Sequence, residues 1–193
     1  MLDFPLLESM NIYLSALTAL QQQGAEIALV ASGHVALCPD LTAEVFLEAP
    51  PIFDRQSAIW KNVLEGRADN GQLDELDCFI NNTSIRLRLT CGETTVELPG
   101  DMYADCWEKH DIPACTIVKL PHHGHRDSIT LRLLDMLEPE DVVISVSNSR
   151  TDDCPAASVI RMVQDKGCRL HITDAVRCGD ICAPARGSVR FSF

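Results

Sequence analysis

The residues best suited to chemistry lie between Leu98 and His125, in the segment LPGDMYADCWEKHDIPACTIVKLPHHGH. A carboxylate, Asp101, follows one apolar run, and two adjacent imidazoles, His122 and His123, follow a second. Carboxylate and imidazole groups are ligands for zinc and other catalytic divalent metals. A cation bound by them would activate a water molecule, so the segment predicts a metal-assisted hydrolase.

Both groups of candidate ligands follow directly after strand-like segments. Residues 94–98 precede the Gly-Asp turn, residues 115–120 precede the His-His-Gly turn, and a short helical connector separates the two strands. Loops at strand ends are where a rigid scaffold usually presents functional groups. The pattern therefore predicts that the ends of two strands position the candidate ligands.

The rest of the chain alternates predicted helices and strands, which indicates one α/β domain over residues 1–193. Helical spacing of apolar residues predicts helices at 6–22, 54–65, 102–109, 128–137 and 155–166, the last with Pro155 in its first turn. Further strands are predicted at 26–31, 34–38, 43–48, 142–146, 169–172, 181–183 and 188–192.

Three segments carry more specific predictions. Ile85, Leu87 and Leu89 alternate with polar residues, so residues 84–90 and 94–98 are expected to form a hairpin with a turn at 91–93, in which Arg86 and Arg88 are solvated. His34, between Gly33 and Val35, is expected to mark a hairpin turn. Residues 67–76 are expected to form a polar loop.

Composition excludes some classes of function and favours others. No apolar run approaches the roughly 20 residues needed to cross a bilayer, so the chain has no predicted membrane segment. The formal net charge of −12 disfavours a partner bound mainly through nucleic-acid phosphates. A metal ion would still supply local positive charge for a phosphoester substrate. Nine cysteines without a CxxC pair predict reduced thiols and a cytoplasmic location.

The order of four segments in this chain resembles that of a known protein family. Four segments, in this order, are similar to those of metallo-β-lactamase-fold hydrolases: NNTSIRLRL (81–89), LPGD (98–101), IVKLPHHGH (117–125) and VVISVSNS (142–149). The branch they resemble is the hydrolase domain of ComEC, the DNA-uptake competence protein, with its free-standing relatives. The resemblance covers residues 80–175 well and the first 50 residues loosely. It implies an αββα sandwich and hydrolysis of DNA phosphodiesters.

The resemblance also implies roles for single residues. Asp101 matches the aspartate that bridges two metal ions in this family, and either His122 or His123 matches its late metal-binding histidine. His125 would share a strand face with His123 if the segment were extended, which makes it a third candidate ligand. The implied site thus has Asp101 and His123 as catalytic residues and zinc or another divalent metal as cofactor.

The chain also departs from the family pattern. The first metal motif of the family, H-x-H-x-D-H, is absent, His125 replaces the usual serine, and Cys154 replaces a histidine. We therefore expect an αββα sandwich that is incomplete at its N-terminus, with a partial or degenerate site. The alternative is a non-catalytic scaffold or interaction domain that keeps the second half of the fold. In either case, missing strands would expose an apolar sheet edge and favour self-association.

Asn82 and Ser84 match an Asn-Ser pair of the family. The resemblance implies a structural role for both at the start of their strand.

Overall fold

The fold was analysed in a computed structural model, which describes residues 5–26, 31–47, 50–146, 154–174, 176–178, 181–183 and 191. The chain divides into two compact units, residues 1–31 and residues 32–193. The first unit contains helix α1 (Pro5–Gln22), which confirms the predicted helix at 6–22. Among the described helices, none is both long enough and apolar enough to span a bilayer.

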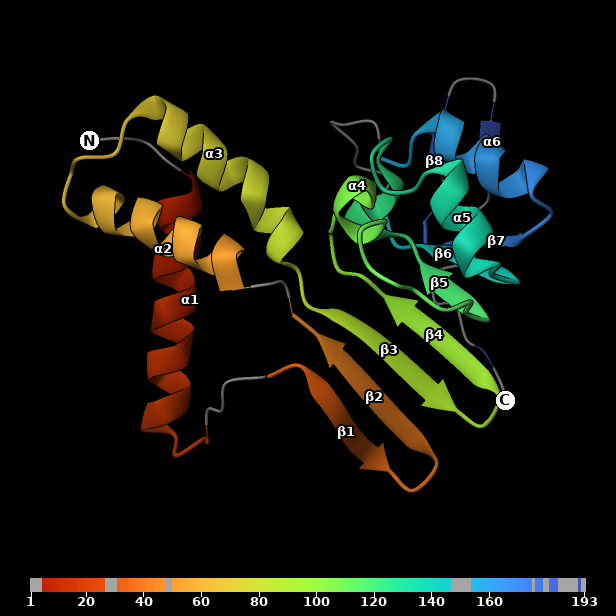
Figure 1. The fold of residues 1–193 in the computed structure, drawn as a ribbon, viewed down its shortest axis with the longest axis horizontal. Coiled ribbons are helices and arrows are strands. Elements are labelled where there is room, and N and C mark those ends of the chain that lie inside the picture. The colour runs from red at the N-terminus through yellow and green to blue at the C-terminus, as the bar shows by residue number, and fades with distance from the viewer. Residues whose placement is uncertain are drawn as a thin grey trace. The chain divides into compact units, whose positions relative to one another are not determined.

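The second unit is built on a seven-stranded mixed sheet whose strands are arranged in chain order (Figure 1). One half is antiparallel and consists of β1 (Gly33–Cys38), β2 (Leu41–Phe46), β3 (Arg86–Cys91) and β4 (Thr94–Leu98). The other half continues parallel to β4 with β5 (Ile117–Lys119), β6 (Asp141–Ile144) and β7 (Arg169–Ile172). A separate hairpin pairs β8 (Val176–Cys178) with β9 (Ile181–Ala183). With six α-helices in the described residues, this sheet confirms the predicted α/β class.

Two helices, α2 (Pro50–Leu64) and α3 (Asn70–Ile80), connect β2 to β3. The first confirms the predicted helix at 54–65, but the polar loop predicted at 67–76 is wrong. Asp69 caps α3 by accepting the backbone N–H of Gln72 at 2.8 Å, and the Gln72 side chain accepts from the Asp69 N–H. This capping box starts a helix inside a polar segment, because it satisfies N–H groups that the first turn leaves unpaired.

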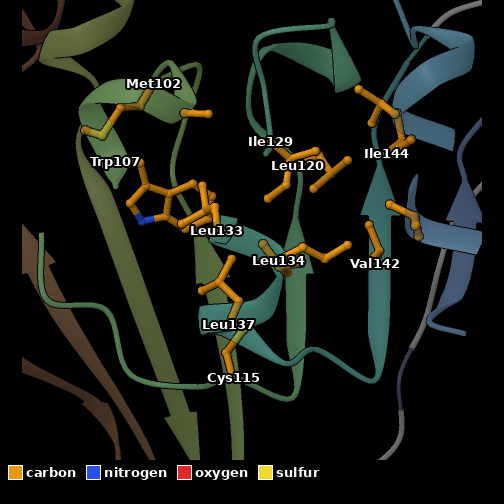
Figure 2. Close-up of a cluster of buried hydrophobic side chains, with 14 of the residues drawn as sticks. Met102, Trp107, Cys115, Leu120, Ile129, Leu133, Leu134, Leu137, Val142 and Ile144 are labelled. Atoms are coloured by element: carbon orange, nitrogen blue, oxygen red, sulfur yellow. The ribbon is translucent and has the colours of Figure 1, made fainter. Parts of the chain in front are cut away.

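The parallel half carries the apolar core under three short helices, α4 (Ala104–Trp107), α5 (Leu131–Leu137) and α6 (Ala157–Asp165). Figure 2 shows side chains of α5 packing against those of the strands. Residues of all three helices and of one face of β5, β6 and β7 form a single buried cluster, so the helices cover the same face of the sheet. Pro155 precedes α6, which begins two residues later than its predicted start.

The antiparallel half instead buries charge, and the prediction that Arg86 and Arg88 are solvated is wrong. Their side chains are 3% and 11% exposed and flank Glu97, which is fully buried. The Arg88 Nη1 atom lies 2.6 Å from Glu97 Oε1, while the Arg86 guanidinium stacks 3.7 Å over the ring of Phe46. Burial raises the pKa of Glu97, and the two arginines oppose that effect. The face of the hairpin that carries Arg86 and Arg88 is covered. The alternation of apolar and polar residues in this strand therefore did not mean that its polar side chains are exposed to solvent.

The edge of the antiparallel half is β1, which is exposed along its whole length. His34 lies inside this strand opposite Glu44, so the prediction that it marks a turn is wrong. The turn is formed instead by Pro39 and Asp40, residue types that favour turns.

Other predicted elements fall partly outside the described residues. The strand predicted at 181–183 is confirmed by β9. Most of the predicted strands at 26–31 and 188–192, and residues 147–149 of the fourth resembling segment, lie outside the described residues.

Candidate metal site at the strand ends

Because β4, β5, β6 and β7 are parallel, their carboxyl ends meet at one edge of the sheet. Asp101 follows β4, the turn Pro121–Gly124 follows β5, and Ser145 follows β6. Ligands of open α/β sheets generally bind outside the carboxyl ends of the strands. The sequence-predicted residues therefore lie at the edge where this architecture places binding sites.

The histidine turn has an unusual backbone. His122 (φ 45°, ψ 39°), His123 (φ 54°, ψ 26°) and Gly124 (φ 74°) are three consecutive residues in the left-handed region. The segment is therefore not extended, and the condition under which His123 and His125 would share a strand face is not met. The His125 N–H donates to the His122 carbonyl at 2.9 Å, and the Ala156 N–H donates to the Gly124 carbonyl at 2.9 Å. These contacts hold a conformation that costs on the order of 1 kcal/mol or more at each histidine.

The turn brings two imidazoles to one carboxylate that sequence reasoning missed. Asp127 Oδ1 lies 3.1 Å from His122 Nδ1 and 2.8 Å from His125 Nδ1. One donor atom from each of the three residues lies within 4.8 Å of the others, a spacing that suits a metal ion. Burial alone would raise the pKa of Asp127, but hydrogen bonds from both histidines hold it below its ordinary value. The signal for Asp127 was its position two residues after His125.

The His123 side chain points toward the end of β6. Its Nδ1 atom lies 2.7 Å from the carbonyl oxygen of Ser145 at the end of β6, and the residue is exposed. A carbonyl only accepts, so His123 donates its Nδ1–H there. Among the described residues, the three-residue group therefore contains His122 and not His123.

Asp101 lies beside the histidine turn without belonging to that group. Its Oδ1 atom accepts the backbone N–H of His122 at 3.1 Å. The Lys119 Nζ atom lies 3.7 Å from the same oxygen and donates to the Gly100 carbonyl at 3.2 Å. The carboxylate thus joins the ends of β4 and β5 and is partly neutralised by an ammonium group.

Residues before β3 fix the loop that carries Asp101. Ser84 Oγ accepts the Asp101 N–H at 3.1 Å, and Asn82 Oδ1 accepts the Tyr103 N–H at 3.2 Å. A Cβ on Gly100 would lie 2.7 Å from the Ser84 Cβ, so only glycine fits this approach. The Tyr103 ring in turn lies 5.5 Å from that of His122. Asn82 and Ser84 thus hold the backbone of the loop that carries Asp101.

Comparison with known proteins adds no family assignment: no protein-family model matches the chain, and a search of curated proteins finds no match.

Proposed function

We propose that this chain is a metal-assisted hydrolase domain of the metallo-β-lactamase fold, with its site at His122, His125 and Asp127. The observation that carries the proposal is the convergence of two imidazoles and a carboxylate at the carboxyl ends of parallel strands. The resemblance of the L-P-G-D and P-H-H-G segments to the ComEC branch supports the αββα sandwich and the class of reaction.

The residues present fit a divalent cation. Catalytic zinc takes about three protein ligands of the His and Asp or Glu type and leaves one position open. The side chains of His122, His125 and Asp127 are 27%, 21% and 39% exposed, so solvent and substrate reach them. Strained non-glycine residues such as His122 and His123 cluster at functional sites, which agrees with this assignment.

A bound divalent cation would supply Lewis acidity and lower the pKa of a water molecule. The protein groups around it would orient the substrate. Lys119, whose side chain is 24% exposed, provides a positive charge beside Asp101 that favours an anionic group such as a phosphodiester. The net charge of −12 opposes long-range attraction of nucleic acid, so binding of a phosphoester would depend on these local cations.

Hydrolysis of bis(p-nitrophenyl) phosphate in Zn²⁺ or Mn²⁺ tests the proposal. We expect activity that chelation by EDTA removes and added metal restores, and loss of bound metal in His122→Ala and His125→Ala. His34→Ala serves as the matched control, because the His34 side chain is 76% exposed and lies on β1, outside the metal-site group. Bound metal below about a tenth of an equivalent, measured by elemental analysis, would refute the proposal.

One observation favours the second candidate, a non-catalytic scaffold. The Lys119 ammonium lies beside the aspartate that the resemblance would place between two metal ions. A fixed ammonium at this position balances the carboxylate charge without a metal. This candidate predicts protein free of metal after exposure to Zn²⁺, with a thermal midpoint that EDTA does not change.

A further inference from the structure

We propose that the Tyr103 hydroxyl donates a hydrogen bond to an oxygen of the substrate phosphodiester at the candidate metal site and stabilises the charge that develops there. Tyr103 lies in the loop between β4 and α4, directly before Ala104, the first residue of α4. The inference rests on the proposed function, because it names a protein group that contacts the substrate of that same site.

The Tyr103 ring is an aromatic neighbour of the metal-site group. Its centroid lies 5.5 Å from that of His122, whose centroid lies 4.9 Å from that of His125. The planes of the Tyr103 and His122 rings are inclined by 54°, so the phenol does not cover the face of the imidazole. Tyr103 is half-buried, so a substrate bound beside His122 can reach it.

The Tyr103 hydroxyl has a proton to donate. Its oxygen lies 3.2 Å from Asn81 Nδ2, and an amide nitrogen only donates, so the hydroxyl accepts this hydrogen bond. The phenol also carries one O–H donor of its own. Among the described residues, that O–H has no hydrogen-bond acceptor. It is therefore available to an oxygen of the substrate.

Two adjacent asparagines hold Tyr103 at its backbone and at its hydroxyl. Asn82 Oδ1 accepts the Tyr103 N–H at 3.2 Å, while Asn81 donates to the hydroxyl. The next N–H along the chain, that of Ala104, donates to the Asp127 carbonyl at 2.9 Å and ties the loop to the segment that carries the metal-site group. A donor fixed in this way needs no reorganisation when charge develops on the substrate, and such donors lower activation barriers.

Tyr103→Phe tests the proposal, because it removes the hydroxyl and keeps the ring. For bis(p-nitrophenyl) phosphate in Zn²⁺ we expect kcat to fall about 100-fold, with KM nearly unchanged, since the hydrogen bond strengthens in the transition state. Tyr13→Phe is the matched control, because Tyr13 lies on α1 and is 58% exposed. An unchanged kcat in Tyr103→Phe would overturn the proposal.

Asn81→Ala separates this role from a structural one. The variant keeps the hydroxyl and removes its anchor, so we expect a smaller fall in kcat than in Tyr103→Phe. A hydroxyl that served only to bond Asn81 would give the same loss whichever partner is removed. Equal losses in the two variants would therefore overturn the proposal.

Calorimetric titration supplies a readout that does not depend on turnover. We expect Tyr103→Phe to bind Zn²⁺ as tightly as the wild type. The zinc-loaded variant should bind orthovanadate, a mimic of the phosphoryl transition state, about 10-fold more weakly. Equal vanadate affinities in variant and wild type would overturn the role of Tyr103.

The same titrations distinguish failure of this inference from failure of the proposed function. A wild-type protein that binds no Zn²⁺ would refute the proposed function and this inference with it. A wild type that binds zinc and hydrolyses the diester, beside a Tyr103→Phe variant that does so equally well, would refute only the role of Tyr103.

Discussion

The antiparallel and parallel halves of the sheet place their charged groups in different ways. The antiparallel half encloses Arg86, Arg88 and Glu97, whereas the parallel half fills the space under its helices with apolar side chains. The parallel half presents ionisable groups outside its strands, at their carboxyl ends. Strand β4 belongs to both halves, because Glu97 closes the buried network and Asp101 follows four residues later. Charge is enclosed as a paired network in one half and lies within reach of solvent in the other.

The largest effect should come from breaking the buried charge network. Glu97→Gln leaves two buried guanidinium groups without a carboxylate, so we expect a loss of about 3–5 kcal/mol in the free energy of unfolding. Urea denaturation measures this loss. Glu75→Gln removes the same charge from the exposed pair with Arg55 and should change stability little. Equal losses in the two variants would show that burial does not strengthen the Glu97 network.

The matching change in the parallel half is Leu133→Ala in α5. Leu133 is fully buried in the apolar cluster, so its truncation should cost about 2–5 kcal/mol. Leu131→Ala on the same helix is the control, because Leu131 is 51% exposed. The same urea denaturation measures both, and a larger loss for Leu131→Ala would contradict the position of the core.

A smaller effect is expected at the histidine turn. Gly124→Ala combines a φ of +74° with a Cβ 3.0 Å from that of Pro155, so we expect a loss of about 2 kcal/mol together with weaker zinc binding. Gly66→Ala has a similar φ of +68° but no atom near the added Cβ, and it should leave zinc binding unchanged. Thermal denaturation and zinc titration measure the two properties. Unchanged zinc binding in Gly124→Ala would separate the turn from the metal site.

The pH dependence of stability tests the charged contacts of Asp141, which lies on β6 opposite β7. A hydrogen bond from Arg169 holds the pKa of Asp141 below its ordinary value, and a further hydrogen bond from His171 contributes despite opposing burial. This contribution is complete above the unfolded-state pKa of about 3.9 and is lost as the pH falls through the lower folded-state pKa. Asp141→Asn should therefore be less stable than wild type at neutral pH, and the difference should shrink below about pH 4. A difference that grows on acidification would reverse the assigned direction.

The smallest expected effect concerns the edge of the antiparallel half. Val35 and Leu37 of β1 are 47% and 55% exposed, and an apolar edge strand invites pairing with a second copy. We expect gel filtration to show dimers that Val35→Lys dissociates. Leu64→Lys on α2, at a residue that is 82% exposed, is the matched control. A monomeric wild-type protein at all concentrations would contradict self-association through β1.

The features predicted from sequence were those set by local patterns. The strand-like segments 94–98 and 115–120 indicated the strands before Asp101 and His122, because β-branched residues such as Thr, Val and Ile are enriched in strands. The capping box at Asp69 was also local, and it could have indicated α3, because Leu73 and Leu76 follow it at helical spacing and are buried. The burial of Arg88 was not predictable in this way, because it depends on the Pro113 carbonyl, which accepts from Arg88 Nη1 at 3.1 Å.

The candidate site, too, was only partly predictable from local sequence patterns. Its residue types and its place after strands could be predicted, since His122 and Asp101 follow apolar runs. The grouping with Asp127 could not, because it depends on a left-handed backbone at two histidines, a conformation that non-glycine residues rarely adopt.

The hydrogen bonds around the histidine turn also determine when the site can form during synthesis. The carbonyls of His122 and Gly124 are held by Cys154 and Ala156, 32 residues further along the chain. A nascent chain that has emerged only through Asp127 already contains His122, His125 and Asp127, the three residues of the metal-site group. It lacks the strand and helix start that fix their backbone. The ribosome therefore completes the ligand set well before the fold can assemble it.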